Sequence, residues 1–386
     1  MYFLKVSLLV FIISVFILFE IGFEYDSLQY RWKELEPFTK SDLLKCRSSF
    51  SYLSSMSSIT ATELNDTFQF FFGKNATCAG RGAQIIINKD IYIRLDRKFD
   101  SDILFFDMFL SRRIRNTLQW LFKLQKANLL PDQVSFLINF EDRLAENCSI
   151  LPATGAPILS WSKDRVDYVV PFLPMGVDMR VKNIKLSWKK KKNIFFWRGS
   201  LTHSLRENLV NMTLSHALMD ARFVTLANCK LVSRLYNNSY YIKNQLMAPR
   251  VKLEEFAEAK FLLDIDGGGW SSRFRNLFAM GSAILKFETN YTEFFYPLLE
   301  EGVNIFWVKT IEELRQKIDF LNQHPDLVEK VAFNSHAMNL RINTHLAMHY
   351  ASNLLEELKL KNRDLPLIDE NFKRVYEFWN QPLAFF

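Results

Sequence analysis

The residues best suited to chemistry follow two apolar runs. In residues 261–287, FLLDIDGGGWSSRFRNLFAMGSAILKF, three glycines precede Arg273. In residues 193–206, NIFFWRGSLTHSLR, a glycine and Ser200 precede Arg206. Glycine lets a ligand approach the backbone closely, and the forked guanidinium of arginine suits phosphate oxygens. Both stretches therefore predict contact with an anionic ligand such as a diphosphate. The alternative is a purely structural turn with Arg273 in solvent.

Two aspartates precede the three glycines. Asp264 and Asp266 form the D-x-D pattern with which many sugar-nucleotide enzymes hold a divalent metal. In a strand both carboxylates share one face, so they can bind a metal or accept hydrogen bonds from N–H groups of the loop. We expect no metal, because arginines can neutralise a diphosphate without an ion. Metal ligation is the alternative.

Strands and a helix are expected to position these residues. The apolar run before Asp264 predicts a buried strand, and residues 283–287 predict another. Between them, apolar residues spaced three and four apart predict a helix, with Ser271 or Ser272 as its cap and Gly281 at its end. This βαβ unit puts the glycine loop at the carboxyl end of a parallel sheet, where α/β proteins bind ligands. Strands alternate with helices along the chain, so we predict an α/β fold.

Four segments together resemble glycosyltransferase family 90, the group of Rumi-like protein O-glucosyltransferases and fungal capsule-associated xylosyltransferases. Two of them are the glycine and arginine stretches, and the others are FLINFED at residues 136–142 and YTEFFYPL at residues 291–298. The resemblance covers about residues 80–355. It implies a GT-B-like fold, in which two Rossmann-type domains face a cleft, and a UDP-sugar as the donor.

The resemblance also implies roles for single residues. Asp142 matches the family's catalytic base, which accepts the proton of the attacking hydroxyl. Glu141 is the competing acid. Strand alternation points the two side chains in opposite directions, so only one of them can face the cleft. A helix cap is the structural alternative for Asp142. The implied donor contacts are Ser200, Arg206, Gly268, Gly269, Trp270, Ser271, Ser272 and Arg273. Arg198 and Asp266 are further candidates, although Arg198 could equally pair with a carboxylate.

The resulting hypothesis is an inverting, metal-independent glycosyltransferase without a cofactor. It would move glucose or xylose from a UDP-sugar to a protein serine or a glycan hydroxyl. Asp142 would act as the base, while the two arginines, Ser200 and the start of the helix stabilise the leaving diphosphate. Two alternatives stay open. One is a degenerate transferase that binds a sugar nucleotide or glycan without turnover, and the other is a metal-dependent transferase that uses Asp264 and Asp266.

Composition and charge agree with this hypothesis. A chain of 386 residues with 49% hydrophobic and 15% aromatic residues can bury a large core. The net charge of +7 favours an anionic ligand or a membrane surface. No basic stripe is interleaved with aromatic residues, so we expect no nucleic acid partner.

Residues 2–23 are apolar apart from Lys5, Glu20 and a few small polar side chains. They predict a signal anchor, with a cleaved signal peptide as the alternative. With Lys5 in the cytoplasm, the membrane protein would be type II and its catalytic part would lie in the lumen of the Golgi or the endoplasmic reticulum. Six N-x-[ST] sequons support the secretory pathway. Four cysteines without zinc-site spacing predict two disulfides, with free thiols in the core as the alternative.

The predicted organisation has five parts. They are a signal anchor or signal peptide (1–24), a weakly ordered stem (25–60), an N-terminal Rossmann-like domain with the base (61–187), a C-terminal Rossmann-like domain for the UDP-sugar (188–345), and a helix and tail that pack back on the body (346–386). The arginines at positions 112, 113 and 115 and the lysines at 189–192 are expected to face solvent.

Overall fold

The computed structural model describes residues 38–72, 81–95, 108–141, 156–162, 169–172, 184, 186–224 and 238–375. All described residues except 38 and 39 belong to one compact unit. The expected anchor at residues 2–23 lies outside the described residues. In the ranges that are described, no helix is both long and apolar enough to cross a membrane.

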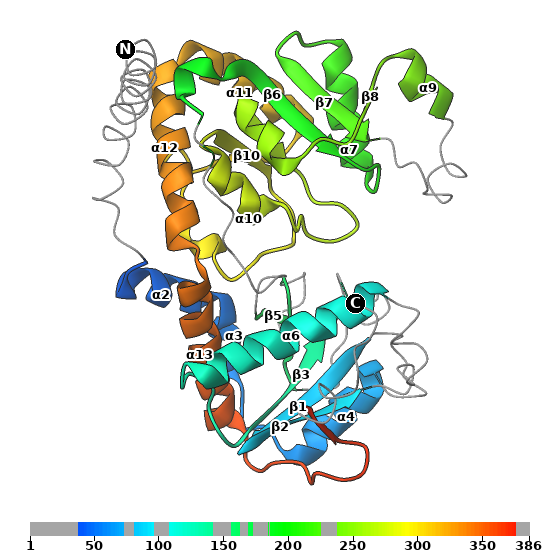
Figure 1. Ribbon diagram of the computed structural model, residues 1–386, viewed down its shortest axis with the longest axis vertical. Coiled ribbons are helices and arrows are strands. Elements are labelled where there is room, and N and C mark those ends of the chain that lie inside the picture. Colours follow the sequence, from blue (N-terminus) through cyan, green and yellow to red (C-terminus); the bar gives the residue numbers. More distant parts are fainter. Residues whose placement is uncertain are drawn as a thin grey trace, which may run out of the picture. The chain divides into compact units, whose positions relative to one another are not determined.

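Helices and strands alternate through most of the compact unit (Figure 1). The α-helices are α2 (Lys40–Arg47), α3 (Ser51–Ser55), α4 (Ala61–Phe72), α6 (Met108–Lys126), α7 (Ser204–Asn211), α9 (Asn238–Lys243), α10 (Phe274–Leu277), α11 (Ile311–Gln323), α12 (Pro325–Arg341) and α13 (Thr344–Lys361). Short 3-10 helices are η1 (Ser48–Phe50), η4 (Trp188–Lys190), η5 (Met212–Leu214), η6 (Leu253–Glu258), η7 (Phe278–Met280) and η8 (Tyr296–Leu298).

The strands form two sheets. The first contains β1 (Gly82–Asn88), β2 (Asp90–Leu95), β3 (Val134–Asn139), β4 (Ile158–Ser160), β5 (Val169–Pro171) and β12 (Lys373–Arg374), in the order β12-β2-β1-β3-β4-β5. The second contains β6 (Lys192–Gly199), β7 (Met219–Val224), β8 (Met247–Ala248), β9 (Ala259–Asp264), β10 (Ala283–Phe287) and β11 (Phe306–Val308), in the order β11-β10-β9-β6-β7-β8. The predicted α/β class is confirmed.

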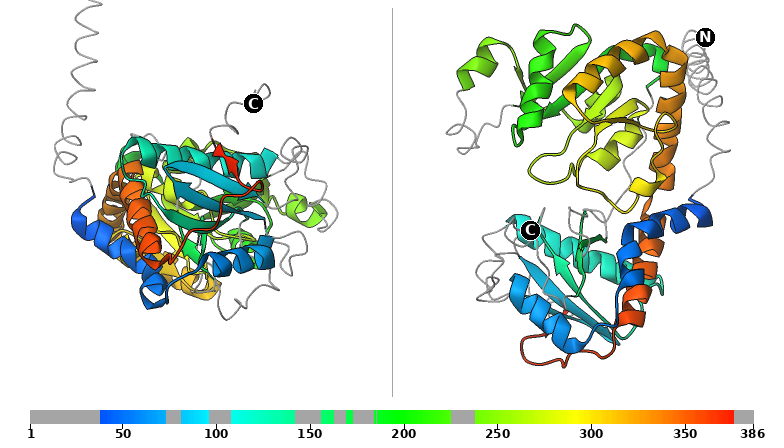
Figure 2. Two further views of the ribbon diagram at one scale, coloured as in Figure 1. Left: turned by 90° about the horizontal axis from the view of Figure 1, so that it is seen from below. Right: turned by 180° about the vertical axis from the view of Figure 1, so that it is seen from behind.

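The first sheet is mixed rather than Rossmann-type throughout. β1 and β2 form an antiparallel hairpin around Lys89, whose φ of 60° suits a tight turn. β1 also runs antiparallel to β3, and only the β3-β4-β5 part is parallel. A connection as short as this one can join only antiparallel strands, since parallel strands need a long crossover. Figure 2 shows α4 and α6 on opposite faces of this sheet.

The segment after α12 returns to the first sheet. α12 packs against β10 of the second sheet, whereas α13 packs against β3 and α6 (Figures 1 and 2). β12 then pairs antiparallel with β2. α13 also contacts α2, so residues 40–55 are helical and packed, which differs from the weakly ordered stem that their serine content predicts. Buried residues such as Phe50 and Leu53 explain the difference, since they give these helices an apolar face.

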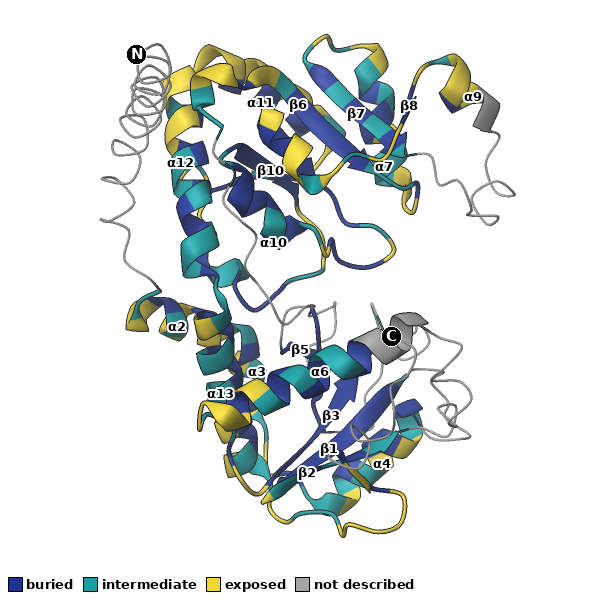
Figure 3. Ribbon diagram, in the orientation of Figure 1, coloured by how far each residue is buried: buried dark blue, intermediate teal, exposed yellow. Residues whose placement is uncertain are grey.

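The second sheet is parallel in every described pairing and covered on both faces. Phe195 of β6 stacks on its register partner Phe261 of β9 with ring centroids 4.0 Å apart, in a core shared with α7, α11 and α12. The next residue, Phe196, meets the ring of Phe256 edge-on at 5.0 Å. Alternating side chains thus enter separate layers, which accounts for the unbroken apolar runs in these strands (Figure 3).

Cysteine chemistry differs from the prediction. Cys46 in α2 is a free, fully buried thiol, and burial raises its pKa to about 12. Two disulfides would require all four cysteines, so that expectation is wrong. The remaining cysteines lie outside the described residues.

A substitution at Leu263 tests the core that supports the glycine loop. This fully buried residue of β9 lies one position before Asp264. Leu263→Ala should lower the free energy of unfolding by about 2–5 kcal/mol in urea denaturation, because the deletion leaves a cavity. Leu360→Ala is the matched control, since Leu360 is 77% exposed, and it should change stability by less than about 0.5 kcal/mol. Equal losses would contradict this placement of the core.

Candidate functional site

The two predicted arginine loops meet at the carboxyl edge of the second sheet. β6 and β9 are parallel neighbours, so the loops that follow them start at the same edge. α7 begins at Ser204 because His203 caps it through Nδ1, which accepts the Leu205 N–H at 3.1 Å. This cap places Arg206 in the first turn of α7, facing the glycine loop.

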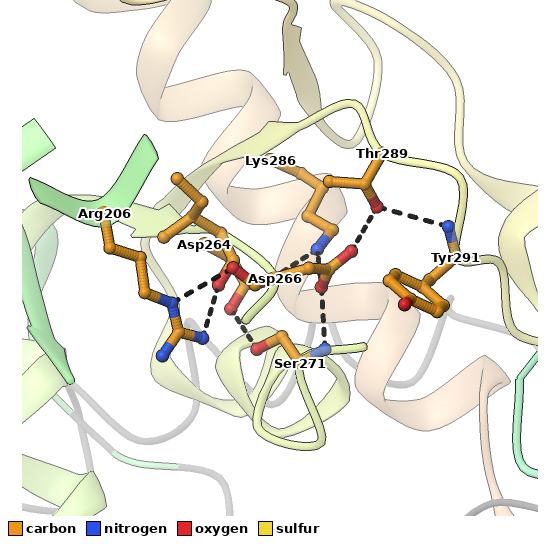
Figure 4. Close-up of polar contacts among 8 residues, drawn as sticks. Arg206, Asp264, Asp266, Ser271, Lys286, Thr289 and Tyr291 are labelled. Atoms are coloured by element: carbon orange, nitrogen blue, oxygen red, sulfur yellow. Dashed lines mark hydrogen bonds and ion pairs between the residues drawn. The ribbon is translucent and has the colours of Figure 1, made fainter. Parts of the chain in front are cut away.

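Arg206 ties the two loops together. Its Nε donates to the carbonyl of Asp266 at 3.1 Å, and Nη2 donates to the carbonyl of Ile265 at 2.9 Å (Figure 4). Its Nη1 donates to the carbonyl of Ser200 at 3.0 Å. Burial and the neighbouring Arg273 lower the pKa of Arg206 to about 10, against the opposing effect of the two aspartates. The guanidinium is therefore a fixed, partly desolvated positive charge.

Gly267 is needed for space rather than for an unusual backbone angle. In the described chain only Gly281 and Gly302 have positive φ among glycines. A Cβ at Gly267 would lie 2.5 Å from Thr202 Oγ1 and 3.0 Å from Arg206 Nη2, so a side chain there would push the loops apart. A Cβ at Gly268 would meet nothing within 4 Å. Gly268 is exposed, and its backbone is open to a ligand.

Arg273 joins the loops from the other side. Its Nη1 donates to the carbonyl of Arg198 at 2.5 Å, and its Cζ lies 5.1 Å from the ring centroid of Phe256. Burial lowers the pKa of Arg273, although Asp264 opposes this shift. Arg206 and Arg273 thus hold two positive charges beside one glycine loop, an arrangement that a bound anion would stabilise.

The two aspartates bind a buried lysine (Figure 4). Lys286 of β10 is the register partner of Asp264, so both side chains project from the same face of the sheet. Its Nζ lies 2.8 Å from Asp264 Oδ2 and 2.6 Å from Asp266 Oδ1. Burial disfavours the ammonium, but the two carboxylates outweigh it and raise the pKa of Lys286.

The same carboxylates hold the loop. Asp264 Oδ1 accepts the Ser271 hydroxyl at 2.6 Å, and Asp266 Oδ1 accepts the Ser271 N–H at 2.7 Å. Asp266 Oδ2 also accepts the hydroxyl of Thr289, whose Oγ1 accepts the Tyr291 N–H at 3.3 Å. Each aspartate is therefore paired with a protein cation and with loop hydrogen-bond donors. Among the described residues, no cluster of three or more His, Cys, Asp or Glu side chains could hold a metal ion.

Ser271 and Ser272 do not cap the helix as predicted. Ser271 bonds to the aspartates, and Arg273 occupies the N-cap position without a side-chain cap bond. α10 spans only Phe274–Leu277 before η7, so its dipole is small. Gly281 does end the helical segment, with a left-handed φ of 61°.

The other predicted site residues divide into two groups. Gly269 and Trp270 are buried in the loop, while Ser200 is half-buried and Ser272 is exposed beside it. Arg198 instead forms a buried ion pair, with Nη2 2.9 Å from Asp220 Oδ2, and two further bonds to carbonyls. This supports the structural alternative for Arg198.

Asp142 lies outside the described residues. Its competitor Glu141 is at the end of β3, where its Oε1 lies 3.6 Å from Arg81 Nε. Asn139 exchanges two hydrogen bonds with the backbone of Glu141, at 3.1 and 3.2 Å, and so fixes the turn that leads toward position 142.

Two charge runs that the sequence predicts to face solvent each contain a buried residue. Arg113 of α6 is only 2% exposed and donates from Nη1 to the carbonyl of Phe140. Lys191 is buried, and its Nζ donates to the carbonyls of Ala257 and Met280 and to Ser282 Oγ. These carbonyls lie far along the sequence, so composition alone does not reveal them.

Sequence reasoning also missed Lys286 and Thr289. The available signal was Lys286 itself, a lone charge inside the apolar run AILKF next to a D-x-D strand. A charged residue is almost never fully buried unless it is paired. That rule could have linked Lys286 to the two aspartates before the structure was known.

The fold and the site define an α/β protein with two arginine-bearing loops at the edge of a parallel sheet. The chain belongs to glycosyltransferase family 90, since the sequence model of that family, described as Glycosyl transferase family 90, matches residues 82–377. The predicted membership is confirmed.

Its relatives include protein O-glucosyltransferases. The chain is 30% identical to an O-glucosyltransferase rumi homolog of Aedes aegypti, over 46% of this chain and 48% of the relative. It is 25% identical to protein O-glucosyltransferase 2 of Danio rerio, over 75% of this chain and 57% of the relative. The matches thus span about half the length of these curated relatives. A solved structure of HepE from Anabaena with UDP-glucose has a TM-score of 0.38 and 13% identity, over 52% of this chain and 64% of that one.

Removing the buried ammonium should be costly. Lys286→Met leaves two buried carboxylates without their cation, and we expect a loss of about 3–5 kcal/mol in the free energy of unfolding, measured in urea. Lys192→Met is the matched control, because the Lys192–Glu258 pair is exposed and should contribute less than about 1 kcal/mol. Similar losses in both variants would show that Lys286 does not hold the loop.

Glu293 should make stability depend on pH. This residue is 5% exposed, and burial raises its pKa from 4.5 to about 8, with Lys286 opposing and Asp266 and Asp264 adding to the shift. Between these pH values the native state keeps a proton that the unfolded chain has released. Stability should therefore fall as pH rises through this window, by up to about 1 kcal/mol per unit.

Denaturation of Glu293→Gln at several pH values measures this effect. The variant cannot titrate at position 293, so its stability should decline less steeply than that of the wild type between pH 4.5 and about 8. Glu288→Gln changes an exposed acid nearby and should keep the wild-type slope. Identical slopes for all three proteins would contradict a protonated Glu293.

Proposed function

We propose that this chain is an inverting glycosyltransferase that transfers glucose or xylose from a UDP-sugar. The acceptor is a protein serine or a glycan hydroxyl. The observation that carries the proposal is the meeting of Arg206, Arg273 and the open backbone at Gly268 at one edge of a parallel sheet. Membership of family 90 and the similarity to protein O-glucosyltransferases support the same chemistry.

The donor diphosphate would lie on the glycine loop. Arg206 and Arg273 are already fixed by backbone carbonyls, so little reorganisation is needed when negative charge grows on the leaving UDP. Ser200 and Ser272 offer hydroxyls beside the same loop. These arginines and hydroxyls would supply the leaving-group side of the reaction. In a GT-B-like arrangement, a second α/β half would present the acceptor.

The base on the acceptor side would be Asp142. Its carboxylate would take the proton of the acceptor hydroxyl as that hydroxyl attacks C1 of the sugar from the face opposite UDP. The competing acid, Glu141, lies close to Arg81 and is partly solvated, which favours a structural role for it.

We propose that the reaction needs no metal. Lys286 already forms ion pairs with the two aspartates that a metal would require, and the two arginines would supply positive charge to the diphosphate. The site of action would be the lumen of the Golgi or the endoplasmic reticulum, with residues 2–23 as a type II membrane anchor.

A sugar-nucleotide-binding protein without turnover is the second candidate. Its hydrogen bonds to the donor would be the same, so the glycine loop does not separate the two candidates. UDP binding by calorimetry, combined with no release of UDP from any UDP-sugar and acceptor, would favour it.

Asp142→Asn is the direct test of the base. The amide cannot accept the proton, so we expect UDP release from UDP-glucose or UDP-xylose in the presence of acceptor to fall about 10²–10⁴-fold. UDP affinity should hardly change. Glu141→Gln is the matched control on the neighbouring acid and should keep most of the activity. Near-normal transfer by Asp142→Asn would refute the assignment.

Metal dependence can be tested on the wild-type chain. If lysine and arginine supply the positive charge, the UDP-release rate should stay within about twofold after treatment with EDTA and after addition of Mn²⁺. Arg273→Ala should lower the rate about 10²-fold or more, because one donor to the developing charge is lost. Loss of activity in EDTA with recovery in Mn²⁺ would instead support a metal-dependent transferase.

A further inference from the structure

Arg113 links two segments that the proposed reaction depends on. It is a residue of α6, it is 2% exposed, and it contacts an element on either side. On one side Nη1 donates to the carbonyl of Phe140, directly after β3. On the other side its Cζ lies 5.6 Å from the ring centroid of Trp270 in the glycine loop. A buried guanidinium is costly to leave unpaired, so both contacts constrain its position.

The segment that Arg113 holds is firmly placed. Phe140 is fully buried, and its N–H donates to the carbonyl of Arg81 at 2.9 Å. Both main-chain groups of Phe140 are therefore fixed, one by Arg81 and one by Arg113. The side chain of Asn139 then fixes the backbone of Glu141. Along the chain, Asp142 comes two residues after Phe140.

The segment on the other side belongs to the glycine loop, which is the donor loop of the proposed reaction. Trp270 is 8% exposed and directly precedes Ser271, whose N–H and hydroxyl bind the paired aspartates. A guanidinium within about 6 Å of an indole ring is attracted to its face, most strongly when both are removed from water. A movement of the donor loop that shifts Trp270 would therefore also shift Arg113.

We propose that Arg113 is a positioning residue that sets the end of β3 against the donor loop. The inference rests on the proposed function, since it assigns Arg113 the task of bringing the base-bearing turn into register with the bound UDP-sugar. Arg113 itself touches neither the sugar nor the diphosphate. Its planar guanidinium donates to a carbonyl and lies near an aromatic ring at once, whereas lysine offers a single point charge. Arg113→Lys therefore keeps the charge and removes the link.

Kinetics and binding on the full-length chain form the first test. We expect Arg113→Lys to lower kcat for UDP release about 10²-fold, as a misplacement of about 1 Å can, while the Kd for UDP from calorimetry changes less than about threefold. Arg115→Lys, on the same helix, is the control and should leave both values unchanged. In a Trp270→Phe background the effect of Arg113→Lys should shrink, because the two residues act as a unit. Wild-type kcat in Arg113→Lys, or equal losses in both backgrounds, would overturn the proposal.

Hydrogen exchange gives a readout that needs no turnover. UDP should slow amide exchange in peptides covering residues 134–141 of the wild type, and this effect should be absent in Arg113→Lys. A wild type that shows this coupling but releases no UDP from any UDP-sugar would refute the proposed function and leave the link intact. Equal UDP-dependent protection in wild type and Arg113→Lys would refute the link, whatever the activity.

Discussion

The buried ammonium of Lys286 is the interaction on which the glycine loop depends. Two carboxylates in an apolar interior repel each other and would be strongly disfavoured alone. Lys286 forms an ion pair with both, and each aspartate then has oxygen lone pairs left for Ser271 or Thr289. One cation from β10 thereby fixes the backbone that follows β9. The loop needs no regular secondary structure of its own to hold its shape.

A loop held in this way can keep two arginines close together without a ligand. Arg206 and Arg273 donate to main-chain carbonyls of both loops, so their positions are set by the backbone. Their mutual repulsion is part of the reason that the pKa of Arg206 is lowered. Positive groups that are fixed before charge develops lose little energy in reorganising, which is the condition for stabilising a leaving diphosphate. The short α10 adds little positive potential, so in the proposed reaction the arginines carry the electrostatic role.

Local pattern correctly predicted the two strands that flank the glycine loop. The apolar run before Asp264 and residues 283–287 agree with β9 and β10 as the structure has them, because apolar runs between turn residues are a local property. The same pattern predicted that the glycine loop lies at the carboxyl end of a parallel sheet. It could not predict that β1 runs antiparallel to β3, since that pairing joins distant segments.

The residues that were read wrongly share one physical feature. Arg113 and Lys191 are the charged cases, and both bind partners far away in sequence although each looks like an ordinary surface residue in its own neighbourhood. A charged side chain has no local signature of burial, because its environment is decided by which backbone carbonyls the fold brings near it. Composition therefore ranks such residues as solvated, and only the tertiary structure reveals their partners.

The D-x-D pattern shows the same limit at the site itself. In sequence, Asp264 and Asp266 are equally suited to a metal and to hydrogen bonds from a loop. The deciding residue is on another strand, and parallel register places Lys286 directly beside Asp264. A lysine there forms ion pairs with both carboxylates, and it ties β9 to β10 in the same contact. The chemistry of a short acidic motif is thus set by the residue that its neighbouring strand places opposite it.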